Sequence, residues 1–231
     1  MIINDEHKYI FIHVPKVAGE SIKNKLGGAQ TPHHLPAKGR QEQIPTKWDS
    51  YYKFSFVRNP WSWLVSLYHF KLHIDSGDVW LRPIIMKNTF SEFIYMLKDS
   101  KSLFPPKWKI QLQFKQQVIN NFGNYIDSML ESNEVPHNKS HLDFYLRDSN
   151  GNLPDYIGKI DTLQEDLDKI CQDIGIERVK LLHQNSSPHR HYSEYYDDET
   201  RDIVAKIFAK DIEYFGWVFE ESPQSLNKLN L

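Results

Sequence analysis

Residues 9–28 read YIFIHVPKVAGESIKNKLGG, and this stretch decides the fold class. Residues 9–14 are mostly apolar and rich in β-branched and aromatic side chains, which is typical of a buried strand that stops at Pro15. Residues 21–26 carry apolar side chains four positions apart and are followed by two glycines, a pattern that predicts a short helix and its end. The stretch therefore predicts a strand, a tight loop and a helix.

The same order recurs at residues 53–73, which read KFSFVRNPWSWLVSLYHFKLH. Residues 53–57 predict a second strand, and the Arg-Asn-Pro sequence that follows predicts a turn. Residues 61–73 predict a helix, because Pro60 suits its first position. An arginine, Arg58, therefore stands at the C-terminal end of the second predicted strand.

The C-terminal third of the chain predicts further strands and helices. Residues 156–160 predict a third strand, and the TLQE sequence at 162–165 is a capping box that opens a helix. Residues 179–182 predict a short fourth strand, and a last helix follows Asp197, its predicted N-cap, and ends at Gly216. Strands separated by helical segments predict an α/β fold with a central parallel sheet flanked by helices.

No repeat, linker or low-complexity segment divides the chain. We therefore predict one domain over residues 1–221, followed by a polar tail over residues 222–231. Residues 74–150 predict helices and loops, including a helix over residues 90–98. Most aromatic side chains of this region are expected in the core, and its loops are expected to carry binding specificity.

The composition is that of an ordinary soluble domain of 231 residues, with 28 basic and 30 acidic side chains and a net charge of −2. This balance argues against a protein that coats nucleic acid or an anionic membrane. The single cysteine, Cys171, excludes an intrachain disulfide framework and a multi-cysteine zinc site. The acidic first residues and the lack of an apolar run of ~18 residues predict a cytoplasmic protein without stable membrane insertion. The oligomeric state stays open.

The loop sequence PKVAGES, residues 15–21, carries the first chemical signal. Where a strand ends and a helix begins, amide N–H groups and the positive end of the helix dipole bind phosphate-like groups. Lys16 adds a charge and Ser21 a hydroxyl. The general phosphate-loop pattern Gly-x4-Gly-Lys-Ser/Thr is absent, which disfavours a nucleotide kinase or an NTPase. The alternative for this segment is a simple turn with an exposed lysine.

Arg58 carries the second signal, because ligands of open α/β sheets collect at the C-terminal edge of the strands. The guanidinium of Arg58 and a serine from the following helix could hold a second anion. Two anion sites on one edge indicate a ligand with two separated phosphate-type groups.

These residues resemble the nucleotide motifs of sulfotransferases that use 3′-phosphoadenosine 5′-phosphosulfate (PAPS). Residues 12–21 are similar to the 5′-phosphosulfate loop, and residues 57–68 to the 3′-phosphate motif. The closer match is the carbohydrate branch, which includes heparan sulfate 2-O-sulfotransferases, chondroitin sulfotransferases and bacterial relatives. The resemblance extends weakly through residues 157–163, 185–187, 192–197 and 211–217.

The resemblance implies a P-loop-kinase-like sulfotransferase fold and transfer of the sulfuryl group from PAPS to a hydroxyl acceptor by in-line displacement. A saccharide is the favoured acceptor, the product nucleotide is 3′-phosphoadenosine 5′-phosphate, and no metal is required. The residues that the resemblance assigns to the nucleotide are Lys16, Ala18, Gly19, Glu20, Ser21, Ile22, Arg58 and Ser66. Lys16 is also expected to stabilise charge on the leaving phosphate. The alternatives are a catalytically degenerate nucleotide-binding module and a phosphotransferase.

His34 is the predicted catalytic base. It precedes Arg58 by 24 residues, and members of the resembled family often carry their proposed base in a His-containing segment between the two motifs. The unperturbed pKa of histidine suits proton abstraction near neutrality. A solvated loop histidine is the alternative, since Pro32 and Pro36 flank this position.

The other histidines do not predict a metal site. His69 and His73 are four apart on a predicted helix, but two ligands without a third make a poor zinc site. His13 lies within a predicted strand, where a packed histidine is expected.

Two positions depart from the family pattern. Glu20 stands where relatives have a neutral residue, so an acid is expected beside the phosphosulfate. Trp63 stands where many relatives have a second arginine, so the help of that residue is missing.

Overall fold

The computed structural model describes residues 2–30, 35–74, 122–127, 139–181 and 190–222. These residues divide into two compact units. The first contains those within 1–63, 139–186 and 205–217, and the second those within 64–138, 187–204 and 218–231. The boundary between a domain and a C-terminal tail stays a prediction, since residues 223–231 lie outside the described part.

A five-stranded sheet forms the centre of the first unit, in the order β3-β1-β2-β4-β5. Its strands are β1 (Ile2–Asn4), β2 (Tyr9–Ile12), β3 (Ala29–Gln30), β4 (Tyr52–Val57) and β5 (Tyr156–Lys159). β2, β4 and β5 are parallel neighbours, with Ile12 opposite Ser55 and Val57 opposite Lys159. The loops that follow these three strands therefore begin at one edge of the sheet.

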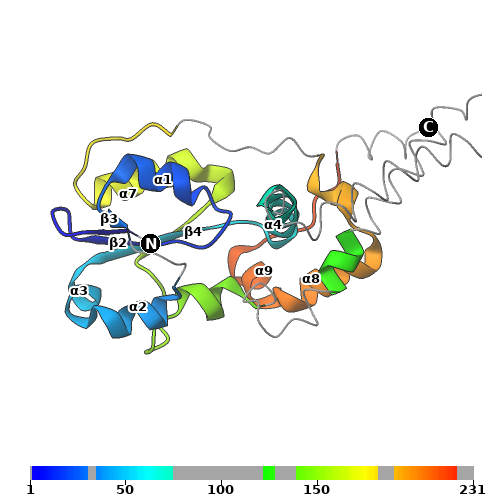
Figure 1. Ribbon diagram of the computed structural model, residues 1–231, viewed down its shortest axis with the longest axis horizontal. Coiled ribbons are helices and arrows are strands. Elements are labelled where there is room, and N and C mark those ends of the chain that lie inside the picture. Colours follow the sequence, from blue (N-terminus) through cyan, green and yellow to red (C-terminus); the bar gives the residue numbers. More distant parts are fainter. Residues whose placement is uncertain (1, 31–34, 75–121, 128–138, 182–189, 223–231) are drawn as a thin grey trace, which may run out of the picture. The chain divides into compact units, whose positions relative to one another are not determined.

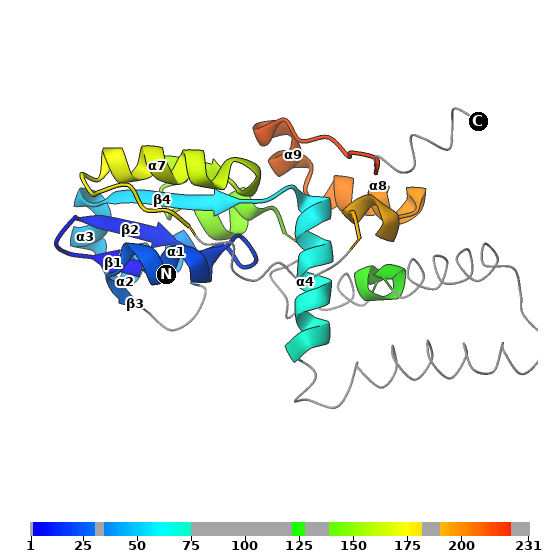
Figure 2. The same ribbon diagram turned by 90° about the horizontal axis from the view of Figure 1, so that it is seen from above.

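Helices cover both faces of the sheet (Figures 1 and 2). They are α1 (Gly19–Leu26) and α7 (Leu163–Asp173) on one face, and α2 (Ala37–Gln43) and α3 (Pro45–Ser50) on the other. Phe11, Phe54 and Phe56 have no exposed surface, and the rings of Phe11 and Phe54 stack at 5.2 Å. This arrangement confirms the predicted α/β class with a central sheet flanked by helices.

The sheet also has an antiparallel part that the sequence did not predict. β1 pairs antiparallel with both β2 and β3. With three and two residues, β1 and β3 are too short to show a clear alternation of apolar and polar side chains. The sheet is therefore mixed, although the three strands that carry the predicted loops are parallel.

The predicted capping box at the start of α7 is wrong. The side chain of Thr162 caps no backbone N–H, and its hydroxyl lies 2.7 Å from a carboxylate oxygen of Asp166. The same carboxylate accepts the N–H of Lys159 at 2.8 Å. Asp166 thus holds the end of β5 against α7.

The predicted strand at 179–182 is also wrong within the described residues, 179–181. The side-chain amide of Gln164 donates to the carbonyl of Val179 at 2.9 Å and accepts the N–H of Leu181 at 2.9 Å. A side chain therefore satisfies backbone groups that a neighbouring strand would otherwise have bonded.

The predicted last helix is two helices, α8 (Asp198–Ile207) and α9 (Ala209–Phe215). Asp197 is the N-cap as predicted, because its carboxylate accepts the N–H of Thr200 at 2.8 Å. Gly216 ends α9 at a φ of 67°, also as predicted.

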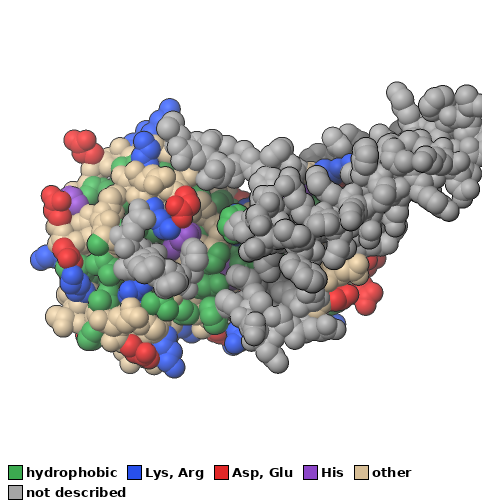
Figure 3. Space-filling model, in the orientation of Figure 1, with side chains coloured by type: hydrophobic (Ala, Val, Ile, Leu, Met, Phe, Trp, Pro, Cys, Tyr) green, Lys and Arg blue, Asp and Glu red, His purple; other side chains and the backbone are tan. Residues whose placement is uncertain are grey.

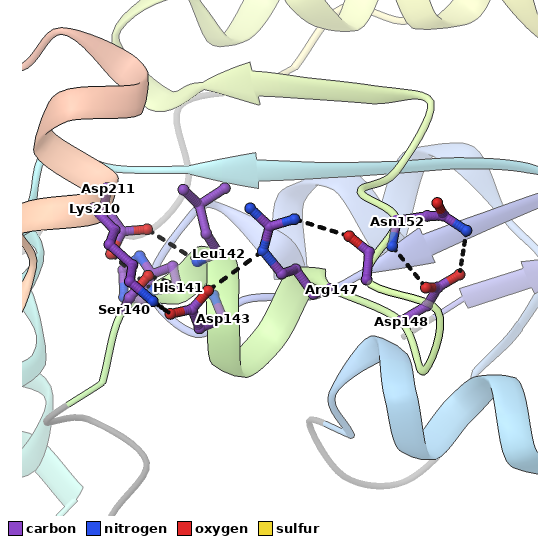
Figure 4. A network of polar contacts seen from close by, with 10 residues as sticks. Ser140, His141, Leu142, Asp143, Arg147, Asp148, Asn152, Lys210 and Asp211 are labelled. Carbon is purple, nitrogen blue, oxygen red and sulfur yellow. Dashed lines mark hydrogen bonds and ion pairs between the residues drawn. The ribbon is translucent and has the colours of Figure 1, made fainter.

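A buried carboxylate joins α9 to the π-helix η2 (Leu142–Leu146) in the first unit (Figure 4). Asp211 has no exposed surface and accepts the N–H groups of His141 and Leu142 at 2.9 Å each. Burial raises the pKa of Asp211. Two bonds that satisfy a buried acceptor make this carboxylate a structural link between the two segments.

Helix α4 (Pro60–Ile74) begins in the first unit and continues into the second. In the second unit, Tyr68 of this helix packs on Phe122 at 5.4 Å and on Tyr125 at 5.3 Å between ring centroids. Phe122 is fully buried, which agrees with the expectation that aromatic side chains of this region lie in the core. The helix predicted over residues 90–98 lies outside the described residues.

Candidate active site

The loop after β2 has an unusual backbone. Lys16 and Ala18 have φ angles of 65° and 60°, in the left-handed region that residues with a Cβ rarely adopt. Val14 and Val17 are fully buried on either side of Lys16 and fix the loop to the core. This conformation directs the loop into the first turn of α1.

The N-terminus of α1 has no side-chain cap within the described part of the chain. The first hydrogen bond of the helix runs from the N–H of Ile22 to the carbonyl of Ala18 at 3.1 Å. The N–H groups of residues 19–21 precede this bond and are oriented to bind an anion or water.

Gly19 is required for the approach of α1 to β2. A Cβ at this position would lie 1.7 Å from Nε2 of His13. The His13 side chain is 5% exposed and stacks on Phe11 at 5.6 Å, so it is the packed histidine that the sequence predicted.

The turn after β4 is built differently. The side-chain oxygen of Asn59 accepts the N–H of Trp61 at 3.1 Å, which caps the start of α4 at Pro60. Nε of Arg58 donates to the hydroxyl of Ser62 at 2.9 Å. Partial burial lowers the pKa of Arg58, and the negative charge of Asp161 opposes this effect.

Lys16 and Arg58 lie within electrostatic reach of each other. Burial, and then the positive charge of Arg58, lower the pKa of Lys16. Two partly desolvated cations that follow neighbouring parallel strands repel each other, and anionic groups bound to them would relieve this repulsion. This edge of the sheet therefore carries two cations and the uncapped N-terminus of α1, groups that can bind anions.

Trp63 connects these two segments. Its indole Nε1 donates to the carbonyl of Pro15 at 2.7 Å, directly before Lys16. Sequence reasoning missed this contact, because the two residues are 48 positions apart. It also missed Ser62, which lies in the first turn of α4, four positions after Arg58.

The predicted nucleotide residues of the first motif lie together in this loop and in the first turn of α1. Ser21 and Ile22 are buried. Glu20 is exposed and forms an ion pair with Lys23 at 2.7 Å, so the acid expected beside the phosphosulfate has a cation as its neighbour.

The remaining predicted residues are not brought to this loop by described contacts. Ser66 is 8% exposed on α4 and belongs to the second unit. His34, the predicted base, lies outside the described residues.

The described residues hold no group of three or more His, Cys, Asp or Glu side chains arranged to bind a metal ion. In the second unit, Nε2 of His69 lies 2.7 Å from the hydroxyl of Tyr195. The side chain of His73 lies outside the described part.

On the face that Figure 3 shows, basic and acidic side chains are interspersed over the described surface.

The comparison with protein families identifies the family of the chain. A model described as the sulfotransferase family matches residues 1–218 of the chain. The chain belongs to the sulfotransferase family, and the protein is a transferase that moves sulfuryl groups. No solved structure matched the chain. None of the described helices is long and apolar enough to cross a membrane.

Proposed function

We propose that the protein transfers the sulfuryl group of PAPS to a hydroxyl group of a carbohydrate. The observation that carries this proposal is the placement of Lys16 and Arg58 directly after the parallel neighbours β2 and β4, beside the uncapped N-terminus of α1. PAPS bears a phosphosulfate and a separate 3′-phosphate, and it thereby offers one anionic group to each of two cations.

The first motif takes the phosphosulfate in this proposal. Lys16 and the N–H groups of residues 19–21 are the donors at that end, and the left-handed conformation of Lys16 and Ala18 holds them in place before the ligand binds. Preformed donors of this kind lose little entropy when the ligand arrives.

The second motif takes the 3′-phosphate. Arg58 is oriented by Ser62 and offers its remaining guanidinium N–H groups as a fork that matches phosphate geometry. Ser66 is assigned to the same phosphate by the family resemblance.

The co-substrate supplies the activated sulfuryl group. Lys16 and the α1 amides would stabilise the negative charge that develops on the departing phosphate oxygen. His34 would accept the proton of the attacking hydroxyl, whose own pKa is far above neutrality. No metal is needed for these two roles.

The choice of a carbohydrate acceptor rests on the resemblance to the carbohydrate branch. The alternative of a degenerate nucleotide-binding module rested mainly on Glu20, and the pairing of Glu20 with Lys23 weakens that argument. The alternative of a phosphotransferase lacks the Gly-x4-Gly-Lys-Ser/Thr pattern.

Calorimetry with 3′-phosphoadenosine 5′-phosphate, AMP and ATP tests the nucleotide part of the proposal. We expect the 3′-phosphorylated nucleotide to bind most tightly, because it alone fills the Arg58 site. Equal binding of all three, or none, contradicts the assignment. Transfer of labelled sulfate to glycans, phenols, lipids and peptides tests the acceptor, and labelling of a phenol or peptide with inert glycans contradicts the carbohydrate proposal.

A further inference from the structure

The indole of Trp63 donates a long-range hydrogen bond to the loop that carries Lys16. Nε1 lies 2.7 Å from the carbonyl oxygen of Pro15. Trp63 is on the first turn of α4, where its N–H bonds to the carbonyl of Asn59 at 2.8 Å. It is therefore fixed to the segment that presents Arg58.

The acceptor of this bond belongs to the peptide group between Pro15 and Lys16. That peptide is planar and trans, so its carbonyl and its N–H point in opposite directions. When the carbonyl of Pro15 points at Trp63, the N–H of Lys16 points away from Trp63. The bond thus sets the orientation of the peptide directly before the residue whose φ is 65°.

The ring that donates this bond is itself held firmly. Trp63 has no exposed surface. Its ring packs edge-to-face on His141 at 4.5 Å and on Phe208 at 5.9 Å between centroids. Neighbours on two other segments of the first unit thus prevent the indole from turning away, and the donor keeps its position.

We propose that Trp63 is a positioning residue of the anion site: its indole N–H holds the Pro15–Lys16 peptide so that Lys16 and the following amides face the ligand, and it couples this loop to the Arg58 turn. The part of this inference that concerns nucleotide rests on the proposed function. The part that concerns the loop does not require a ligand.

The test removes the indole N–H and keeps the ring shape. Replacing Trp63 by 3-benzothienylalanine substitutes sulfur for the N–H group in a two-ring side chain of similar size, and Trp63→Phe is the simpler variant. If Trp63→Phe fails to fold, the benzothienyl variant alone tests the role of the indole N–H. The matched control is Trp48→Phe, because Trp48 is 3% exposed in the same unit and its Nε1 donates to Asp148 at 3.2 Å, away from the loop.

Two measurements are made on each variant. The first is the amide signals of residues 16–19 in the ligand-free protein, followed by NMR. The second is the dissociation constant of 3′-phosphoadenosine 5′-phosphate, followed by calorimetry. We expect the Trp63 variants to shift the loop signals and to weaken binding about 5- to 50-fold, as the loss of a buried hydrogen bond does. The Trp48→Phe control should leave the amide signals of residues 16–19 unchanged. Its dissociation constant should stay within about twofold of the wild-type value.

The inference is overturned if the loop signals of the Trp63 variants match those of the wild type. It is also overturned if the nucleotide binds the Trp63 variants as tightly as the control. If the wild-type protein does not bind the nucleotide at all, the proposed function fails, and the loop signals alone decide the role of Trp63.

Discussion

The loops after β2 and β4 present their cations by opposite means. The loop after β2 places two residues in the left-handed region and leaves its helix without a side-chain cap within the described residues. The turn after β4 is capped by Asn59 and orients Arg58 through a side-chain bond. The first loop therefore offers backbone N–H groups beside Lys16 and stores strain, whereas the second offers the side chain of Arg58 before an ordinary helix start.

The largest expected effect concerns the catalytic base, which is assigned to neither loop. His13, which directly follows β2, is 5% exposed and packed against Gly19. If His34 is the base, His34→Ala should lower turnover about 10²- to 10⁴-fold while nucleotide affinity stays nearly unchanged. The measurement is kcat beside the dissociation constant of the product nucleotide.

His33→Ala is the matched control, since it removes the neighbouring imidazole and should leave turnover close to wild type. If His34→Ala keeps more than about a tenth of the turnover, the assignment to His34 is wrong.

Arg58→Ala removes the cationic side chain that the turn after β4 presents. Removing one partner of a partly buried charged pair should cost roughly 2–5 kcal/mol of affinity for 3′-phosphoadenosine 5′-phosphate. AMP binding should change little, because AMP lacks the 3′-phosphate. Arg178→Ala is the control, since Arg178 is exposed and pairs with Asp168 on the surface. Equal losses for both nucleotides would show that Arg58 does not read the 3′-phosphate.

Lys16→Ala tests the loop after β2, which keeps its backbone N–H groups when the lysine is removed. Because the amides of residues 19–21 remain, the loss of affinity should be smaller, about 1.5–3 kcal/mol, and turnover should fall as well. Kinetics with saturating PAPS separate the two effects. Lys25→Ala removes an exposed lysine from the last turn of α1 and should change neither the nucleotide affinity nor the turnover. An unchanged turnover in Lys16→Ala would remove Lys16 from the catalytic step.

The sequence predicted the parts of this comparison that depend on local pattern. The strand cores at residues 9–12, 53–57 and 156–159 carry dense apolar side chains, and Asp197 and Gly216 carry the usual signals for helix ends. The two loops were found because each follows such a strand.

The predictions failed where a distant or competing side chain decided the outcome. At Thr162, the carboxylate of Asp166 takes the hydroxyl that a capping box would have used. At residues 179–181, Gln164 replaces a neighbouring strand. The bond from Trp63 to Pro15 joins segments that only the folded sheet brings together. A short window of sequence does not contain both partners of this last contact, which lie 48 positions apart.

Asn59→Ala removes the cap of the conventional helix start. The free energy of unfolding should fall by about 1 kcal/mol, the usual loss for an N-cap side chain. Chemical denaturation measures this change. Asp197→Ala, which removes the cap of α8, should give a loss of similar size. A loss well below that of Asp197→Ala would mean that Pro60 alone starts α4.

Ala18→Gly makes the matching change at the start of α1, and the expected sign is opposite. Ala18 precedes α1 at a φ of 60°, where a residue with a Cβ is strained by about 1–2 kcal/mol and glycine is not. Glycine also makes the unfolded chain more flexible, which offsets roughly 0.5–1 kcal/mol of this gain. The free energy of unfolding should therefore rise by up to about 1.5 kcal/mol. Ala205→Gly, in the interior of α8, is the control and should destabilise by about 1 kcal/mol. If Ala18→Gly destabilises as much as Ala205→Gly, the loop after β2 stores no strain, and the contrast between the two helix starts is lost.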